Sequence, residues 1–209
     1  MQFTITPNQI IYAVTGHRGD KLGGWDNGAP LNQAIQRRLE GFIARAAVEN
    51  PDKEIVIVTG MALGADTLWA LAGINMRHHY PNVKIHAAIP FHGQEKPWPD
   101  HAQKLYHEIL AQANSAHYVV DSNGKKLSKY EAAKAMHERN EYMVNICHYL
   151  IAVYDGVSSS GGTYECLKYA KQGRFVKDND GNVIEHHYSK TLKHIYYLRF
   201  REEFQHILL

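Results

Sequence analysis

Short apolar runs rich in β-branched residues alternate along the chain with longer segments in which apolar residues recur at helical spacing. Several of the short runs are almost continuously apolar, which is typical of strands buried on both faces of a parallel sheet. The runs expected to form strands are Ile10–Thr15, Glu54–Thr59, Val83–Ile89, Ala116–Val120, Tyr149–Tyr154 and His194–Leu198. Alternation of this kind favours βαβ units with right-handed crossovers. The pattern therefore predicts an α/β fold of three layers, with a mostly parallel sheet flanked by helices.

One stretch near the C-terminus interrupts this alternation. The segment Lys177–Lys190 is polar and contains an Asp-Gly pair, which favours a tight turn. We expect it to be a surface excursion or a hairpin. Because no repeat, low-complexity tract or linker is recognisable elsewhere, residues 1–209 are expected to form a single domain.

Composition and charge narrow the class of protein. Hydrophobic residues make up 44% and charged residues 21% of the chain, an ordinary globular balance, and the formal net charge is +2. So small a net charge makes nucleic acid an unlikely partner. There is no apolar run of the roughly 20 residues that a membrane span needs, and no signal-peptide pattern at the start. We expect a cytoplasmic protein without a membrane partner, and two cysteines provide no disulfide framework.

Small and polar residues follow four of the predicted strands. Ligands of open parallel sheets bind beyond the carboxyl ends of the strands, where glycine lets a phosphate approach the backbone and a following helix offers free N–H groups. Each loop taken singly could equally be a tight turn with no ligand. Together they predict a site for a phosphate-bearing ligand. The segments concerned are Gly16–Arg18, Gly60–Asp66, Pro90–Phe91, and Asp155 with Gly161–Thr163.

A polar pair stands on the apolar face of a predicted helix, Lys129–Cys147. Arg139 and Asn140 lie three and four residues after Met136 and therefore share its face. A guanidinium in that position recognises a phosphate or carboxylate well, but it could instead form an internal salt bridge, for instance to Asp155 or Glu165. Either alternative points Arg139 inward.

The motifs in these loops resemble the SLOG superfamily, and most closely its YpsA/YspA-type branch of bacterial and phage proteins. The resemblance rests on six motifs in this order: Val14–Arg18, Thr59–Asp66, Ile89–Phe91 with Gln94–Lys96 and Trp98, Arg139-Asn140, Val153–Gly156, and Gly161–Thr163. It implies a Rossmann-like fold with a pocket for a nucleotide or a nucleotide-derived ligand such as NAD or ADP-ribose. Relatives include DprA and the LOG phosphoribohydrolases, and they commonly dimerise, so a homo-oligomer is expected. The predicted ligand-binding residues are Gly16, His17, Arg18, Gly60, Met61, Gly64, Asp66, Pro90, Phe91, Arg139, Asn140, Asp155, Gly161, Gly162 and Thr163.

Two functions remain open: a sensor or sequestering protein that only binds its ligand, and an N-glycosidase or phosphoribohydrolase acting on nucleoside monophosphates or NAD-like substrates. The LOG enzymes carry Pro-Gly-Gly-x-Gly-Thr-x-x-Glu, whereas here Ser160–Glu165 lacks the proline and has one residue fewer between threonine and glutamate. One residue turns a helical side chain by about 100°. Glu165 and Asp66 are the candidate catalytic carboxylates, with Asp155 and His17 as further candidates. Asp66 could alternatively cap a helix.

Other chemistries lack their motifs. The adjacent histidine pairs His78-His79 and His186-His187 have no further ligand at metal-binding spacing, so no metal is expected. Neither a Walker motif nor GxGxxG follows the first strand, and no cofactor is predicted to be required. Trp25 and Trp98 are candidates for stacking on a base.

The end of the chain offers apolar surface. Tyr196–Phe200 and Ile207–Leu209 are rich in aromatic and aliphatic residues. They could pack on a second subunit or cover this chain's own sheet, and the sequence leaves both open.

Overall fold

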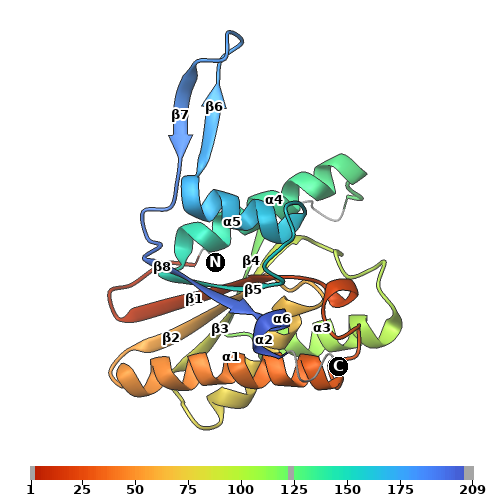
Figure 1. The fold of residues 1–209 in the computed structure, drawn as a ribbon, viewed down its shortest axis with the longest axis vertical. Coiled ribbons are helices and arrows are strands. Elements are labelled where there is room, and N and C mark those ends of the chain that lie inside the picture. Colours follow the sequence, from red (N-terminus) through yellow and green to blue (C-terminus); the bar gives the residue numbers. More distant parts are fainter. Residues whose placement is uncertain (1–2, 122–124, 205–209) are drawn as a thin grey trace.

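The computed structural model describes residues 3–121 and 125–204, which build a six-stranded sheet with helices on both faces (Figure 1). The strand order is β4-β3-β2-β1-β5-β8, and all five pairings are parallel. The α/β, three-layer, Rossmann-like class predicted from the sequence is confirmed. Each predicted strand is present, with ends that differ by at most two residues. The strands are β1 (Gln9–Gly16), β2 (Glu54–Thr59), β3 (Val83–Phe91), β4 (Ser115–Val120), β5 (Tyr149–Tyr154) and β8 (His194–Arg199).

Three long helices cover one face of the sheet and two cover the other (Figure 1). The first group is α1 (Pro30–Glu49), α2 (Ala65–Arg77) and α3 (Asp100–Gln112), and the second is α4 (Lys129–Ile146) and α5 (Gly162–Gln172). Two short elements were not predicted, the 3-10 turn η1 (Gly19–Lys21) and α6 (Phe200–Glu203). Strands covered on both faces need apolar side chains at successive positions, which explains the continuous runs in the sequence.

Local signals fix the start and end of the helices beside the site. α4 begins with a capping box, in which Ser128 accepts from the N–H of Glu131 and Glu131 accepts from the N–H of Ser128. α5 ends at Gln172, and Gly173 caps it with a φ of +71°, a backbone conformation that glycine adopts without strain.

The polar segment near the C-terminus forms an antiparallel hairpin of β6 (Arg174–Lys177) and β7 (Val183–His187). It starts three residues before the predicted excursion, because α5 ends at Gln172 and only Gly173 separates it from β6. The predicted Asp-Gly pair, Asp180 and Gly181, lies in the connecting turn, and Gly181 has a φ of +87°. The hairpin projects from the body of the protein beyond α5 (Figure 1).

The order of the strands creates a switch point beside β1. From β1 the chain moves outward through β2, β3 and β4, and it then returns over the sheet in α4 to place β5 on the other side of β1. Loops that leave neighbouring strands in opposite directions open a crevice at the carboxyl ends of those strands. Here the crevice lies between the loop after β1 and the loop after β5.

The last strand, β8, is the edge strand of this chain's own sheet, where it pairs with β5. Leu198 and Phe200 are each 1% exposed and belong to the core with α1 and α2, so this part of the C-terminal segment packs internally. Ile207–Leu209 lie outside the described residues. Within residues 3–121 and 125–204, every helix is too short or too polar to cross a membrane.

Candidate functional site

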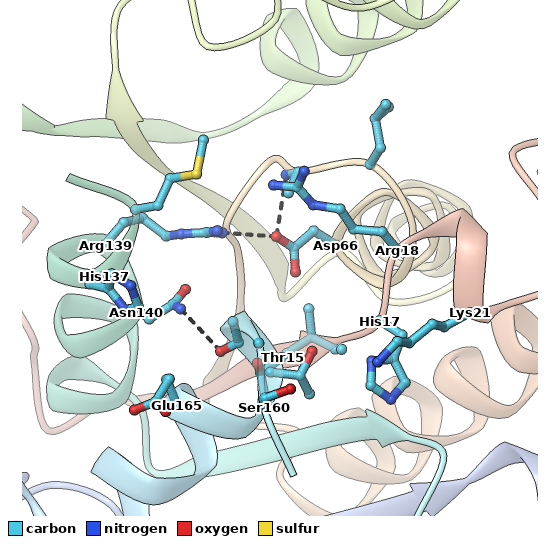
Figure 2. Close-up of a pocket in the computed structure, with 18 of the residues that line it drawn as sticks. Thr15, His17, Arg18, Lys21, Asp66, His137, Arg139, Asn140, Ser160 and Glu165 are labelled. Carbon is cyan, nitrogen blue, oxygen red and sulfur yellow. Dashed lines mark hydrogen bonds and ion pairs between the residues drawn. The ribbon is translucent and has the colours of Figure 1, made fainter. Parts of the chain in front are cut away.

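A cavity of about 540 Å³, which we call the switch-point cavity, opens between the carboxyl ends of β1 and β5 (Figure 2). Its walls come from four parts of the chain that are distant in sequence. The end of β1 and the turn after it supply residues from Val14 to Lys21, and the start of α2 supplies Asp66. One face of α4 contributes Arg139 and Asn140, and the first turn of α5 closes the opposite side.

The first turn of α5 presents its backbone to the cavity. Gly161 precedes the helix with a φ of +92° and makes no side-chain cap, and Gly162 and Thr163 follow. The first N–H groups of a helix have no partner within the helix and carry its positive dipole end. A Cβ atom at Gly161 or Gly162 would meet nothing within 4 Å. These glycines therefore leave open space in front of unpaired donors, which is what an anion requires.

Arg139 reaches the cavity from α4 and forms a buried ion pair. Its Nη1 lies 2.8 Å from Oδ2 of Asp66, and both residues are 7% exposed. The same oxygen accepts from the N–H of Ala62 at 3.2 Å. The guanidinium Nε is buried and finds no hydrogen-bond partner among the described residues, so a donor next to the cavity is unsatisfied.

The inward direction predicted for Arg139 is confirmed, but both partners suggested for it are wrong. α4 crosses over β3 and β1 and brings Arg139 to the end of β2, where α2 begins, rather than to Asp155 or Glu165. Asp66 is also not the cap of α2, because Gly64 occupies that position without a side-chain cap. Its carboxylate instead holds Arg139 and the loop at Ala62.

Gly60 and Gly64, predicted to bind ligand, have packing roles in the structure. A Cβ atom at Gly60 would lie 1.2 Å from Nη1 of Arg139, so the missing side chain makes room for the guanidinium. Gly64 has a φ of +96°, and a Cβ there would lie 2.5 Å from the carbonyl oxygen of His17. The loop after β2 thus uses its glycines for close contact with Arg139 and with the loop after β1.

The loop after β5 is organised by Asp155. Its carboxylate accepts from the N–H groups of Val157 and Ser158 and from the Ser158 hydroxyl, and it lies 3.2 Å from Nε2 of His17. Burial would raise the pKa of Asp155, but these hydrogen bonds outweigh it and hold the pKa well below the usual range of a carboxyl. Lys21 donates to the Ser158 hydroxyl at 2.9 Å and so links the loops after β1 and β5.

The structure brings together only part of the predicted site. Pro90 and Phe91 end β3, two strands away from the switch point, and Trp98 packs edge-on against Tyr106 of α3. Trp25 covers Gly19 and is 55% exposed. The predicted residues that line the switch-point cavity are Gly16, His17, Arg18, Asp66, Arg139, Asn140, Gly161, Gly162, Thr163 and Glu165. Those outside its lining are Gly60, Met61, Gly64, Pro90, Phe91 and Asp155.

Sequence reasoning missed five polar residues of the cavity wall: Thr15, Asp20, Lys21, His137 and Ser160. His137 could have been found, because it lies three residues before Asn140 and therefore on the same helix face. Lys21 belongs to a polar loop, where lysine is ordinarily solvated and gives no signal.

The charges around the cavity are mixed. Arg18 and Lys21 are cations that take no part in the Arg139–Asp66 pair (Figure 2), and Asp20 and Glu165 are carboxylates. Such a wall can hold a phosphate while offering an acceptor to a hydroxyl or a water molecule. Among the described residues no three metal-ligating side chains gather into a group that could hold a metal ion.

The fold and the position of the cavity define a Rossmann-like α/β protein with a cavity at the topological switch point. The family model of the YspA SLOG family matches residues 12–186, and the chain belongs to this family. The SPbeta prophage-derived protein YoqJ of Bacillus subtilis is 35% identical over 55% of this chain and 68% of its own length. A UPF0398 protein of Bacillus thuringiensis is 31% identical over 78% of this chain and 84% of its own length. A UPF0398 protein of Bacillus cereus (strain B4264) is 30% identical over the same shares.

Proposed function

We propose that this protein binds a nucleotide or a nucleotide-derived ligand of the NAD or ADP-ribose kind in the switch-point cavity, as a sensor or sequestering protein. The observation that carries the proposal is the open first turn of α5, which faces the buried guanidinium of Arg139 across the cavity (Figure 2). Unpaired helix N–H groups and an arginine on opposite walls provide complementary contacts to one phosphate group.

The ligand's phosphate would lie against Gly162 and Thr163, where the helix dipole and the backbone donors act together. The guanidinium of Arg139, which lines the cavity, would contribute its charge from α4. Arg18 and Lys21, on the loop after β1, would add charge from a third side. Asp66 keeps Arg139 in place and is itself occupied by it, so the pair is a fixed part of the wall.

The volume supports a ligand of nucleotide size. Small-molecule sites have volumes of roughly 300–1,000 Å³, and the switch-point cavity has about 540 Å³. Its lining combines apolar patches, such as Leu63 and Met136, with the polar groups named above. Apolar wall area beside a phosphate site is suited to a ribose and a base.

Calorimetric titration of the purified protein with AMP, ADP, ADP-ribose and NAD tests the proposal. At least one of these ligands is expected to bind saturably with one site per chain. Absence of heat and of ligand retention for the whole panel would refute it. A matched pair of variants locates the site: Gly162→Val fills open space in the cavity, whereas Gly41→Val fills open space on the outer face of α1.

A second function, hydrolysis of an N-glycosidic bond, is favoured by the position of Glu165. Its side chain lines the cavity within the first turn of α5. In such a reaction Glu165 would accept a proton from water as the oxygen bonds to C1′ of the ribose. The bond from C1′ to the base would break, with its electron pair going to the base nitrogen. Adenine leaving AMP would take up a proton from Glu165 or solvent, whereas the nicotinamide of NAD leaves as a neutral ring without one.

Chromatography of the protein incubated with AMP or NAD distinguishes binding from hydrolysis, because only hydrolysis releases free base. Hydrolysis predicts free base in proportion to the protein, and its loss in Glu165→Gln but not in the control Glu138→Gln on the exposed side of α4. Recovery of intact ligand after prolonged incubation would contradict hydrolysis and leave binding alone.

A further inference from the structure

A further cavity, of about 500 Å³, lies at the opposite edge of the sheet from the switch-point cavity, and we call it the amino-edge cavity. It opens where β1 and β5 begin, and the turn at Thr6 and Pro7 closes one side. The end of α1 contributes Asn50 to another side. None of its lining residues lines the switch-point cavity, so the two cavities are separate.

Three basic residues of the amino-edge cavity each stand directly before a strand. Lys53 precedes β2, His148 precedes β5 and Lys193 precedes β8. These strands are parallel and belong to the run β2-β1-β5-β8, so the residues before them lie at the same edge of the sheet. The parallel arrangement therefore gathers three residues that are far apart in the sequence around one cavity.

Hydrogen bonds fix the backbone at each of these positions. The N–H of His148 donates to the carbonyl oxygen of Ile11, and the N–H of Lys193 donates to that of His148, both at 2.8 Å. The N–H of Lys53 donates to the carbonyl oxygen of Asn50 at 3.1 Å. The ring of His148 is held as well, because its Nδ1 accepts from the N–H of Ile11 at 3.0 Å. The neutral ring thus carries its proton on Nε2, which makes Nε2 a donor.

No acidic side chain balances the basic residues in the wall of this cavity. Among the residues that the structure describes, no carboxylate lines the amino-edge cavity, and neither Lys53 nor Lys193 takes part in an ion pair. Asp52 and Glu54 flank Lys53 in the sequence but lie outside the lining. The carboxylate of Glu54 accepts from the side-chain amide of Gln9 at 3.1 Å. The two ammonium groups are therefore available to a ligand.

The basic groups repel one another across the cavity. Burial lowers the pKa of His148, and the charges of Lys193 and Lys53 lower it further. An anion between the three groups would remove this repulsion and accept hydrogen bonds from each of them. Basic residues at this edge also complement the carbonyl ends of α1 and α4. That role requires no ligand and predicts no saturable binding of an anion.

The aromatic lining of the cavity does not favour a base. Tyr149 is the tyrosine that lines it, and its ring stacks on the ring of Tyr12 with centroids 4.9 Å apart. The ring of Tyr196 lies against it as well, at 5.9 Å. Because these neighbours occupy the ring of Tyr149, it is not free to stack on a nucleotide base.

The spacing of the strands sets the kind of anion. β5 and β8 are neighbours, so His148 and Lys193 can contact the same phosphate group. Lys53 stands two strands away from His148, or about 10 Å at a strand spacing of about 4.8 Å. We propose that the amino-edge cavity is a second anion site, which binds a free oligophosphate chain through Lys193, His148 and Lys53. The site is separate from that of the proposed function and does not depend on it.

Calorimetric titration with inorganic pyrophosphate at low ionic strength tests this inference in the Gly162→Val variant, whose switch-point cavity is blocked. Pyrophosphate is expected to bind at one site per chain and about 10-fold or more tightly than inorganic phosphate, because its second phosphate reaches Lys53. ADP should bind this variant no more tightly than pyrophosphate. In the wild-type protein, pyrophosphate should shift the NMR signals of the His148 ring, which are identified by their absence in His148→Gln.

Lysine variants in the Gly162→Val background assign the contacts. Lys53→Met is expected to remove the gain of pyrophosphate over phosphate, whereas Lys193→Met should weaken the binding of both about 10-fold or more. Lys104→Met on α3 is the matched control, because the side chain of Lys104 is 80% exposed and lies outside both cavities. The control should bind both probes like its parent.

The opposite results are equally clear. If pyrophosphate does not bind Gly162→Val, or if neither lysine variant weakens its binding, the inference is overturned and the basic residues serve the helix ends alone. Equal affinity for phosphate and pyrophosphate, or tighter binding of ADP, would overturn the assignment to a free oligophosphate. Unshifted signals of His148 in the wild type would overturn the site whether or not Gly162→Val folds. Each of these results leaves nucleotide binding in the switch-point cavity untouched.

Discussion

Two pairs of loops look alike in sequence but have different roles in the structure. One pair follows β1 and β5, and the other follows β2 and β3. Gly161 and Gly162, after β5, face open cavity space, whereas neighbouring atoms occupy the space beside Gly60 and Gly64, after β2. All of these glycines lie in loops or helix starts that follow parallel strands at one edge of one sheet. The difference shows that a glycine after a strand marks either an approaching ligand or an approaching protein atom. The strand order alone does not decide which, because Gly16, at the end of β1 beside the switch point, is also packed: a Cβ atom there would lie 2.4 Å from the Cβ of Ala65.

The largest expected effect concerns the buried ion pair of Arg139 and Asp66, beside the loop after β2. Arg139→Met would leave the carboxylate of Asp66 buried without its partner, so the free energy of unfolding should fall by about 3–5 kcal/mol. The double variant Arg139→Met with Asp66→Asn removes the unpaired charge and keeps an acceptor for the N–H of Ala62. It should regain most of the loss in urea denaturation. A single-variant loss below about 1 kcal/mol would mean that the pair is solvated.

A substitution at Gly162, which faces the cavity, is expected to weaken ligand binding without lowering the stability of the protein. Gly162→Val should weaken ADP binding at least about 100-fold, or about 2.7 kcal/mol, because the side chain enters the space meant for a phosphate. Its free energy of unfolding should stay within about 1 kcal/mol of the wild type. Gly41→Val should leave ADP binding unchanged. A variant that unfolds easily would show that Gly162 is needed for packing instead.

Gly64→Ala should behave in the opposite way to Gly162→Val. Alanine at this position would have to adopt a φ of +96°, which is strained for a residue with a side chain. Its methyl group would also lie 2.5 Å from the carbonyl oxygen of His17, so we expect a loss of stability of about 2–3 kcal/mol. Gly41→Ala, in the middle of α1 with nothing within 4 Å, should raise stability by up to about 1 kcal/mol. Thermal unfolding of both variants gives the comparison, and equal stabilities would argue against close packing at Gly64.

His86 in β3 and Asp155 after β5 should make the free energy of unfolding depend on pH in two separate ranges. Burial, with a smaller effect of His117, lowers the pKa of His86 on β3 from 6.5 to about 4, so the folded state resists protonation there. As the pH falls from 6.5 towards 4, the unfolded state gains protons first and stability decreases, by about 2 kcal/mol at pH 5. Asp155, after β5, has a lowered pKa and contributes stability above its ordinary value of 3.8, which is lost only at lower pH.

Urea unfolding at pH 7.5 and pH 5 tests the first of these windows. In the structure His86 contacts Ser115 and Tyr142 through its two ring nitrogens, at 2.8 and 3.0 Å. His86→Gln should show a difference between the two pH values that is smaller than the wild-type difference by about 2 kcal/mol. The same pH dependence in both proteins would rule out His86 as its source.

Local patterns in the sequence predicted the elements well for a physical reason. β2 and β5 are buried on both faces, so nearly every position is apolar and the bounds of both were predicted to the residue. The strand order left no comparable trace, because pairing Tyr12 with Tyr149 brings together residues that are far apart in the chain. The site depends on that order, and residues such as Pro90 and Phe91 were therefore assigned to it although they lie two strands away.

The role of a residue in the site was predictable only where its side chain did not match the pattern around it. Arg139 stood out because a guanidinium on an apolar helix face demands a partner, and it is indeed buried. The identity of that partner depended on where α4 crosses the sheet, which no local pattern contains. Lys21 is an ordinary residue for a polar loop and was therefore missed, although it links the loops after β1 and β5.

A crystal structure of the protein with ADP tests the division between the two kinds of loop most directly. A phosphate oxygen should lie about 3 Å from the N–H of Gly162 or Thr163 and on the cavity side of Arg139, with the loop after β2 unchanged. A phosphate bound instead against Gly60–Gly64, or at the end of β3, would contradict the assignment of the site to the switch point.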